Sequence, residues 1–135
     1  MRILSTALLI VIAITASADA TPLEDRFPVE IRLTGDDALS QNLDAALGAA
    51  LDSDSGLRPA MEGDDKRLSI ISDSNVGWDK LGGRKVAIYT VYLAGGTYRS
   101  GPMTGVCYVV SLSKCAKDIL RRMRKVMSLG AFDER

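Results

Sequence analysis

The stretch KVAIYTVYLAGG, residues 85–96, decides the fold of this chain. Residues 85–93 are rich in β-branched and aromatic side chains, which favour a β-strand. Ala94-Gly95-Gly96 predicts a three-residue hairpin turn, and residues 97–107 return as the partner strand. Pro102 lies in this second strand, where a residue without an N–H fits an edge or a bulge. The turn implies a register that pairs Leu93 with Thr97, Tyr92 with Tyr98 and Val91 with Arg99.

Neither face of the strand at residues 85–93 is fully polar. One face carries Val86, Ile88, Thr90 and Tyr92, and the other carries Ala87, Tyr89, Val91 and Leu93. A sheet that is solvated on one side shows a cleaner alternation of apolar and polar residues. We therefore expect either that the helices cover opposite faces of the sheet or that one face meets another chain. That chain would be a second copy, in a homodimer, or a protein partner.

Patterns on either side of the hairpin predict the remaining elements. Residues 28–33 alternate as a half-buried strand, and residues 67–72 form a second strand. Between them, Thr34-Gly35-Asp36-Asp37 has the T-x-x-D pattern of a helix start, and this helix ends within residues 52–56. The rest is a connector at 57–65, a loop or irregular strand at 73–84, and a second helix at 114–129.

The predicted order is β-α-β-β-β-α, an α+β fold with a mixed sheet and two amphipathic helices. The first β-α-β step implies parallel strands joined by a right-handed crossover, and the hairpin adds antiparallel strands. Residues 21–135 are enough for one domain with its own core.

The first twenty residues have the layout of a secretory signal peptide. Arg2 precedes an apolar stretch, and Ala18-Asp19-Ala20 forms an A-x-A cleavage site. The apolar stretch is shorter than the roughly 20 residues that span a bilayer, and the mature chain has no second candidate span. We expect cleavage near Ala20 and a mature protein, residues 21–135, that is periplasmic or secreted.

Cys107 and Cys115 are the two cysteines of the chain. In an exported protein they are expected to form a disulfide, which would stabilise the fold by about 2.5 kcal/mol. Disulfide geometry requires Cα atoms within roughly 7 Å of each other. We therefore predict that the strand before the last helix ends or bends close to Cys107.

The element order, export signal and size resemble envelope modules of the TolB N-terminal and CsgG type. The pair Cys107 and Cys115, with the Ala116-Lys117 that follows, is similar to a pattern in small exported proteobacterial proteins of unknown function. These resemblances imply an accessory or assembly role in the cell envelope, without catalytic residues to carry over.

The chain has no histidine. This excludes Ser-His-Asp and Cys-His catalysis and histidine-ligated zinc, and no cofactor or metal motif is present. The remaining acid-base candidates are carboxylates, and a hydrolase would need a cleft that contains Glu62, Asp64 or Asp65 with one raised pKa. We expect a protein that is not an enzyme.

Charge is distributed unevenly although the net charge is zero. Residues 21–65 hold eleven acidic and three basic residues, and residues 66–135 hold thirteen basic and five acidic residues. Either the two parts complement each other in the fold or they meet a charged partner. The basic face of the last helix fits an acidic protein or an anionic membrane surface. Nucleic acid is excluded because no basic footprint covers the domain.

The sequence therefore predicts an exported, non-enzymatic interaction or accessory protein of the bacterial cell envelope. It would bind a protein partner or self-associate through its hairpin. The alternatives are a secreted effector that acts on host or competitor cells, and a small-ligand carrier with a Leu- and Met-lined pocket between helix and sheet. The expected interaction surface comprises Trp78, Tyr92, Tyr98, Arg99, Arg121, Arg122, Arg124 and Lys125.

Overall fold

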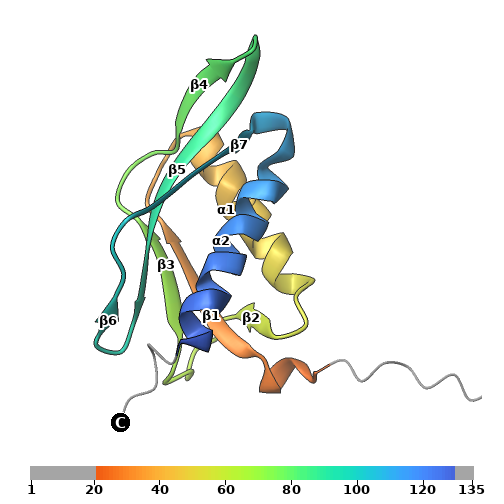
Figure 1. Cartoon of the computed structure of the whole chain (residues 1–135). Coiled ribbons are helices and arrows are strands. Elements are labelled where there is room, and N and C mark those ends of the chain that lie inside the picture. The colour runs from red at the N-terminus through yellow and green to blue at the C-terminus, as the bar shows by residue number, and fades with distance from the viewer. Residues whose placement is uncertain (1–20, 130–135) are drawn as a thin grey trace, which may run out of the picture.

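Two helices pack on one face of a curled, mixed sheet in the computed structural model of the chain, which makes the fold α+β as predicted (Figure 1). The structure describes residues 21–129, and the predicted signal peptide lies outside the described residues. Within this range the elements are β1 (Phe27–Leu33), α1 (Ala38–Asp52), β2 (Leu57–Pro59), β3 (Leu68–Ser72), β4 (Gly77–Leu81), β5 (Arg84–Gly95), β6 (Tyr98–Arg99), β7 (Met103–Tyr108) and α2 (Leu112–Ser128), with 3-10 turns at Leu23–Asp25 and Val109–Ser111.

The sheet contains both parallel and antiparallel pairs. β1 lies between β2 and β3 and is parallel to both, so the predicted parallel β-α-β step is confirmed. β5 is the longest strand and is antiparallel to all its neighbours. Ala94 pairs with both β3 and β6, and Ile88 pairs with both β4 and β7. β3 and β4 therefore follow one edge of β5, and β6 and β7 follow the other.

The described chain has seven strands where the sequence predicted four. The connector at 57–65 contains β2, and the segment at 73–84, expected to be a loop or an irregular strand, contains the regular strand β4. The sequence did not predict β4 as a regular strand because all five of its residues are exposed, so buried and exposed positions do not alternate along it. Gly82 and Gly83, with φ of 57° and 77°, form the two-residue turn that joins β4 to β5.

The predicted turn at Ala94-Gly95-Gly96 and its register are wrong. β5 continues to Gly95, which pairs with Tyr98, and the turn is the two residues Gly96 and Thr97. Gly96 has a φ of 55°, which lets the short turn follow the twist of the strands. Between the pair Ala94–Arg99 and the pair Val91–Met103, the return strand has one residue more than β5, which forms a β-bulge. Pro102 lies in this bulge, as predicted.

Both helices cover the same face of the sheet, so the first of the two expected alternatives, helices on opposite faces, is wrong (Figure 1). The core between them and the sheet includes Leu43 and Leu47 from α1 and Ile119 and Met123 from α2, all at most 1% exposed. The two helices fit side by side on one face because each presents a narrow apolar stripe. The other face of the sheet, here called the open face, has no helix over it among residues 21–129.

The end of α1 and both ends of α2 agree with the predictions within two residues, but α1 begins three residues after the start that the T-x-x-D pattern predicted at Thr34. Asp37 caps α1 by accepting a hydrogen bond from the Ser40 backbone N–H at 3.0 Å. Thr34 has a different role from the predicted capping pattern, because its hydroxyl donates to the Ser72 carbonyl at 2.7 Å. The structure contains no helix, within residues 21–129, that is long and apolar enough to cross a membrane.

The disulfide between Cys107 and Cys115 is present, with Cα atoms 5.6 Å apart. β7 ends at Tyr108, one residue after Cys107, and the chain turns through Val109–Ser111 into α2. The predicted end of the strand near Cys107 is therefore confirmed. The disulfide fits a protein of an oxidising compartment.

Candidate interaction groove

The structure divides the predicted interaction residues among separate places. Tyr92 and Arg99 lie together on the open face, with the guanidinium 5.3 Å from the ring centroid. Tyr98 packs against the core on the helix-covered face. Trp78 is 57% exposed on β4, where the Lys85 ammonium lies 4.5 Å from its ring. The basic residues Arg121, Arg122, Arg124 and Lys125 project from α2.

β7 is an edge strand of the sheet. It pairs with β5 on one side, and within residues 21–129 no strand pairs with its other side. The Thr104 carbonyl accepts a hydrogen bond from Arg122 Nη1 at 3.0 Å, so this carbonyl points away from β5 and toward α2. Edge strands with unpaired backbone groups are sites where another chain can add.

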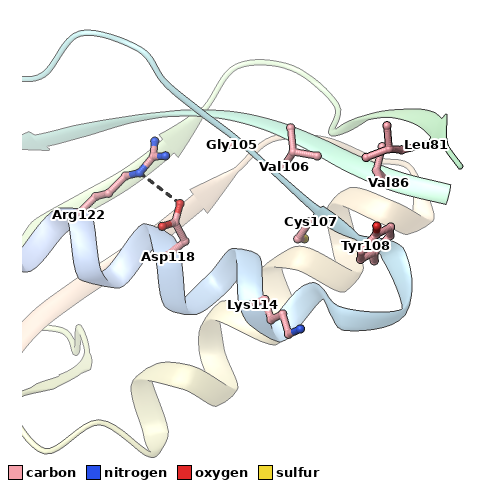
Figure 2. A pocket seen from close by; sticks show the side chains of 9 residues that line it. All are labelled: Leu81, Val86, Gly105, Val106, Cys107, Tyr108, Lys114, Asp118 and Arg122. Atoms are coloured by element: carbon pink, nitrogen blue, oxygen red, sulfur yellow. Dashed lines mark ion pairs between the residues drawn. The ribbon is translucent and has the colours of Figure 1, made fainter. Parts of the chain in front are cut away.

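A groove of about 460 Å³ lies along this edge (Figure 2). Its sheet wall is formed by four consecutive residues of β7 together with Val86 of β5 and Leu81 of β4, and its helix wall carries three residues spaced four apart on one face of α2. We call it the edge groove. Its lining residues are Leu81, Val86, Gly105, Val106, Cys107, Tyr108, Lys114, Asp118 and Arg122.

Tyr89 and Gly105 connect the core to the floor of the groove. Tyr89 is 1% exposed, and its hydroxyl donates to Asp118 Oδ2 at 2.6 Å. To reach Asp118 the ring passes over Gly105, its partner across the strand pair. A Cβ at position 105 would lie 2.1 Å from the Tyr89 hydroxyl and 2.3 Å from Cζ. Only glycine leaves room for this contact.

Asp118 is the electrostatic centre of the helix wall. It accepts from Tyr89, pairs with Arg121 and lies 3.2 Å from Arg122 Nε. The hydrogen bond from Tyr89 and the two arginines hold the pKa of Asp118 below its ordinary value. Burial, with the hydrogen bond to Asp118, raises the pKa of the Tyr89 phenol. The carboxylate therefore stays ionised and compensated, and Arg122 is oriented toward β7.

The opposite end of the groove is apolar and lies on the open face. Leu81 and Val106 are 60% and 58% exposed, whereas Val86 beside them is buried. The Arg84 guanidinium lies 4.1 Å from the centroid of the Tyr108 ring and borders this end. Large aliphatic side chains that stay exposed next to an open strand edge are typical of protein-binding surfaces.

Positive charge dominates the helix wall. α2 carries six basic residues and one acidic residue. Of the six ion pairs among residues 21–129, only Arg124 with Asp54 and Arg67 with Glu30 join the acidic first part of the chain to the basic second part. Within the same residues no carboxylate pairs with Lys114 or Lys117. Within residues 21–129, the two parts of the chain therefore compensate each other only in part.

Asp64, one of the carboxylates considered for hydrolysis, has a structural role. Its two oxygens accept from the Arg58 guanidinium at 2.7 and 2.6 Å, and one also accepts from the Met61 N–H. These bonds lower the pKa of Asp64, whereas a general acid needs a raised one. Among the described residues, no group of three acidic or cysteine side chains is placed to hold a metal ion.

Comparisons with protein-family models, with curated proteins and with solved structures found no match to the chain. The edge groove therefore has to be interpreted from its own geometry. Sequence reasoning selected Arg122 but missed Leu81, Gly105, Val106, Lys114 and Asp118. A glycine inside a strand, as at position 105, was the one available signal, because such a residue often marks close approach of another group.

Proposed function

We propose that this chain is an exported, non-enzymatic interaction protein of the bacterial cell envelope, which binds a protein partner along the edge groove. The observation that carries the proposal is the open edge of β7, with exposed Val106 on one side and the basic face of α2 on the other, and with exposed Leu81 of β4 lining the same groove. Proteins usually protect such an edge with a charge, a proline or a covering segment. Here the apolar side chains at the edge favour contact with another protein.

Export is supported by two features that are independent of each other. The first twenty residues have the signal-peptide pattern, and the disulfide requires an oxidising environment to persist. We expect the protein purified from the cells that make it to begin near Thr21 and to lie outside the cytoplasm. Intact mass and cell fractionation test this, and an uncleaved cytoplasmic chain would contradict it.

Photo-crosslinking in those cells tests the binding surface. A benzophenone side chain replaces Val106 in the groove or, as a control, the exposed Ala45 on α1, which lies in no described pocket. We expect irradiation to give a discrete adduct from position 106 that position 45 does not give. The same adducts from both positions, or none from either, would refute the edge groove as the working surface.

A further inference from the structure

We infer that the edge groove takes an extended acidic segment of its partner, which adds to β7 as a further strand of the sheet. This inference rests on the proposed function and specifies the chemistry of the partner. In the bound segment, apolar residues alternate with glutamate or aspartate.

The backbone of β7 offers the hydrogen bonds for such an addition. The Thr104 carbonyl faces away from β5, as its bond to Arg122 shows, and backbone groups alternate between the two edges of a strand. The N–H and C=O of Val106 therefore also face the groove. Val106 is the second of the four consecutive β7 residues that line the groove. An extended peptide in this position would complete the unpaired edge by β-strand addition.

One wall of the groove is apolar and the other is basic. This difference predicts that apolar and acidic residues alternate in the bound segment. Successive side chains of an added strand point to opposite faces of the sheet. Those on the open face would lie beside Val106, which is exposed and apolar. Those on the helix-covered face would lie beside Lys114 and Arg122 of α2. An apolar residue fits the first position and a carboxylate fits the second.

The bound segment is expected to be acidic because the carboxylate of Asp118 is already paired within the protein. Its carboxylate already binds Tyr89, Arg121 and Arg122, so it adds little free negative charge to the groove. Lys114 in the groove and Lys117 beside it on α2 have no carboxylate partner among residues 21–129. An acidic segment would supply that partner, and a basic segment would be repelled.

A second copy of this chain is a poorer occupant of the same edge. Two β7 strands joined edge to edge by a twofold axis would form one continuous sheet, with both α2 helices on the same face. Each α2 carries six basic residues and one acidic residue, so the two helices would repel each other. An acidic partner avoids this repulsion and gains from the same charges.

Nuclear magnetic resonance titration of the ¹⁵N-labelled oxidised protein tests the inference. The probe is a blocked heptapeptide that alternates glutamate and valine. One comparison peptide has lysine in place of glutamate. A second keeps every charge but is N-methylated at the central valine and the next glutamate, which blocks both backbone edges. We expect the first peptide to shift the Val106 and Tyr108 amides and to slow hydrogen exchange at Val106. The comparison peptides should bind at least about tenfold more weakly.

Matched charge reversals separate a local contact from general attraction. Lys114→Glu, in the groove, should weaken binding about tenfold, and Lys66→Glu, exposed in the bend before β3 and outside the groove, should change it less than about twofold. Both variants change the net charge equally, and dispersed amide spectra would show that both fold.

Three results would overturn the inference. The first two are binding of the lysine peptide or of the N-methylated peptide as tight as that of the glutamate peptide. The third is protection of the Val106 amide from hydrogen exchange that increases with protein concentration in the absence of peptide, which would assign the edge to a second copy. If position 106 still crosslinks to a partner in cells, any of these leaves the proposed function standing and removes only the strand addition. If the crosslink is absent as well, both fail.

Discussion

Gly105→Ala should destabilise the protein strongly, although alanine normally strengthens a strand. Glycine inside a strand is about 0.5–1 kcal/mol worse than alanine, so an unconstrained site would gain stability from this change. Here the new Cβ would meet Tyr89 at 2.1 Å from the hydroxyl, 2.3 Å from Cζ and 2.6 Å from Cε1. The ring, which is 1% exposed, would have to move by roughly an ångström into packed core.

The loss of stability is the sum of two costs, a steric cost and the loss of a hydrogen bond. Forcing a methyl group into a packed site costs about 1–3 kcal/mol. Withdrawing the hydroxyl from Asp118 loses a hydrogen bond to a charged group, worth about 1.5–3 kcal/mol, and the low end applies because Asp118 is partly exposed. We expect a total loss of about 3 kcal/mol. For a domain of this size, that is a fall of roughly 12 °C in Tm.

Urea unfolding followed by far-ultraviolet circular dichroism, with the disulfide intact, measures this loss. The control is the same substitution in a Tyr89→Leu background, where the ring is absent and Gly105→Ala should change stability by less than about 0.5 kcal/mol. A Tyr89→Phe background should give only partial relief, because Cζ and Cε1 remain. A stable Gly105→Ala variant, or an equal loss with and without the ring, would refute the proposed contact between Tyr89 and position 105.

Three further predictions concern other parts of the fold. Gly48→Ala in the interior of α1 should raise the unfolding free energy by about 0.5–1 kcal/mol in the same urea assay, because a Cβ there meets no atom within 4 Å. Replacing both Cys107 and Cys115 with serine should lower the unfolding free energy by about 2.5 kcal/mol. Reduction of the wild-type protein should lower its Tm to about that of the double variant. The lowered pKa of Asp118 adds stability above its unfolded pKa of about 3.9, and this is lost as the pH falls through the folded value. The stability difference between wild type and Asp118→Asn should therefore shrink as the pH falls below about 4, and a constant difference in acid unfolding curves would contradict this.

The sequence predicted the elements whose patterns reflect burial. The strand at residues 85–93 and the stripes of both helices carry apolar residues at the period of their structure, because one side of each packs in the core. The disulfide followed from export and from the short separation of its cysteines. β4 was missed because it is stabilised by pairing with β5 and by the Gly82-Gly83 turn, without a buried side of its own.

The hairpin register and the groove depend on information that is not local. A two-residue turn at Gly96 and Thr97 competes with the three-residue turn at Ala94-Gly95-Gly96, and the bulge before Met103 decides between them only after the strands pair. The groove needs β7 at the edge of the sheet and α2 beside it. The pairing of Tyr89 with Gly105 and the reach of Tyr89 to Asp118 appear only once both segments are in place.

The disulfide also sets the direction in which α2 can unravel. Cys115 lies in the first turn of the helix and is tied to β7 at Cys107, so the N-terminal end of α2 stays attached even when its backbone hydrogen bonds open. The C-terminal end has no such tether within the described chain, and helix ends open most readily. Local opening therefore starts near Ser128 and moves backward along the helix. Lys114 is the last of the groove residues on α2 to be released, so the helix wall near the disulfide outlasts the wall at Arg122.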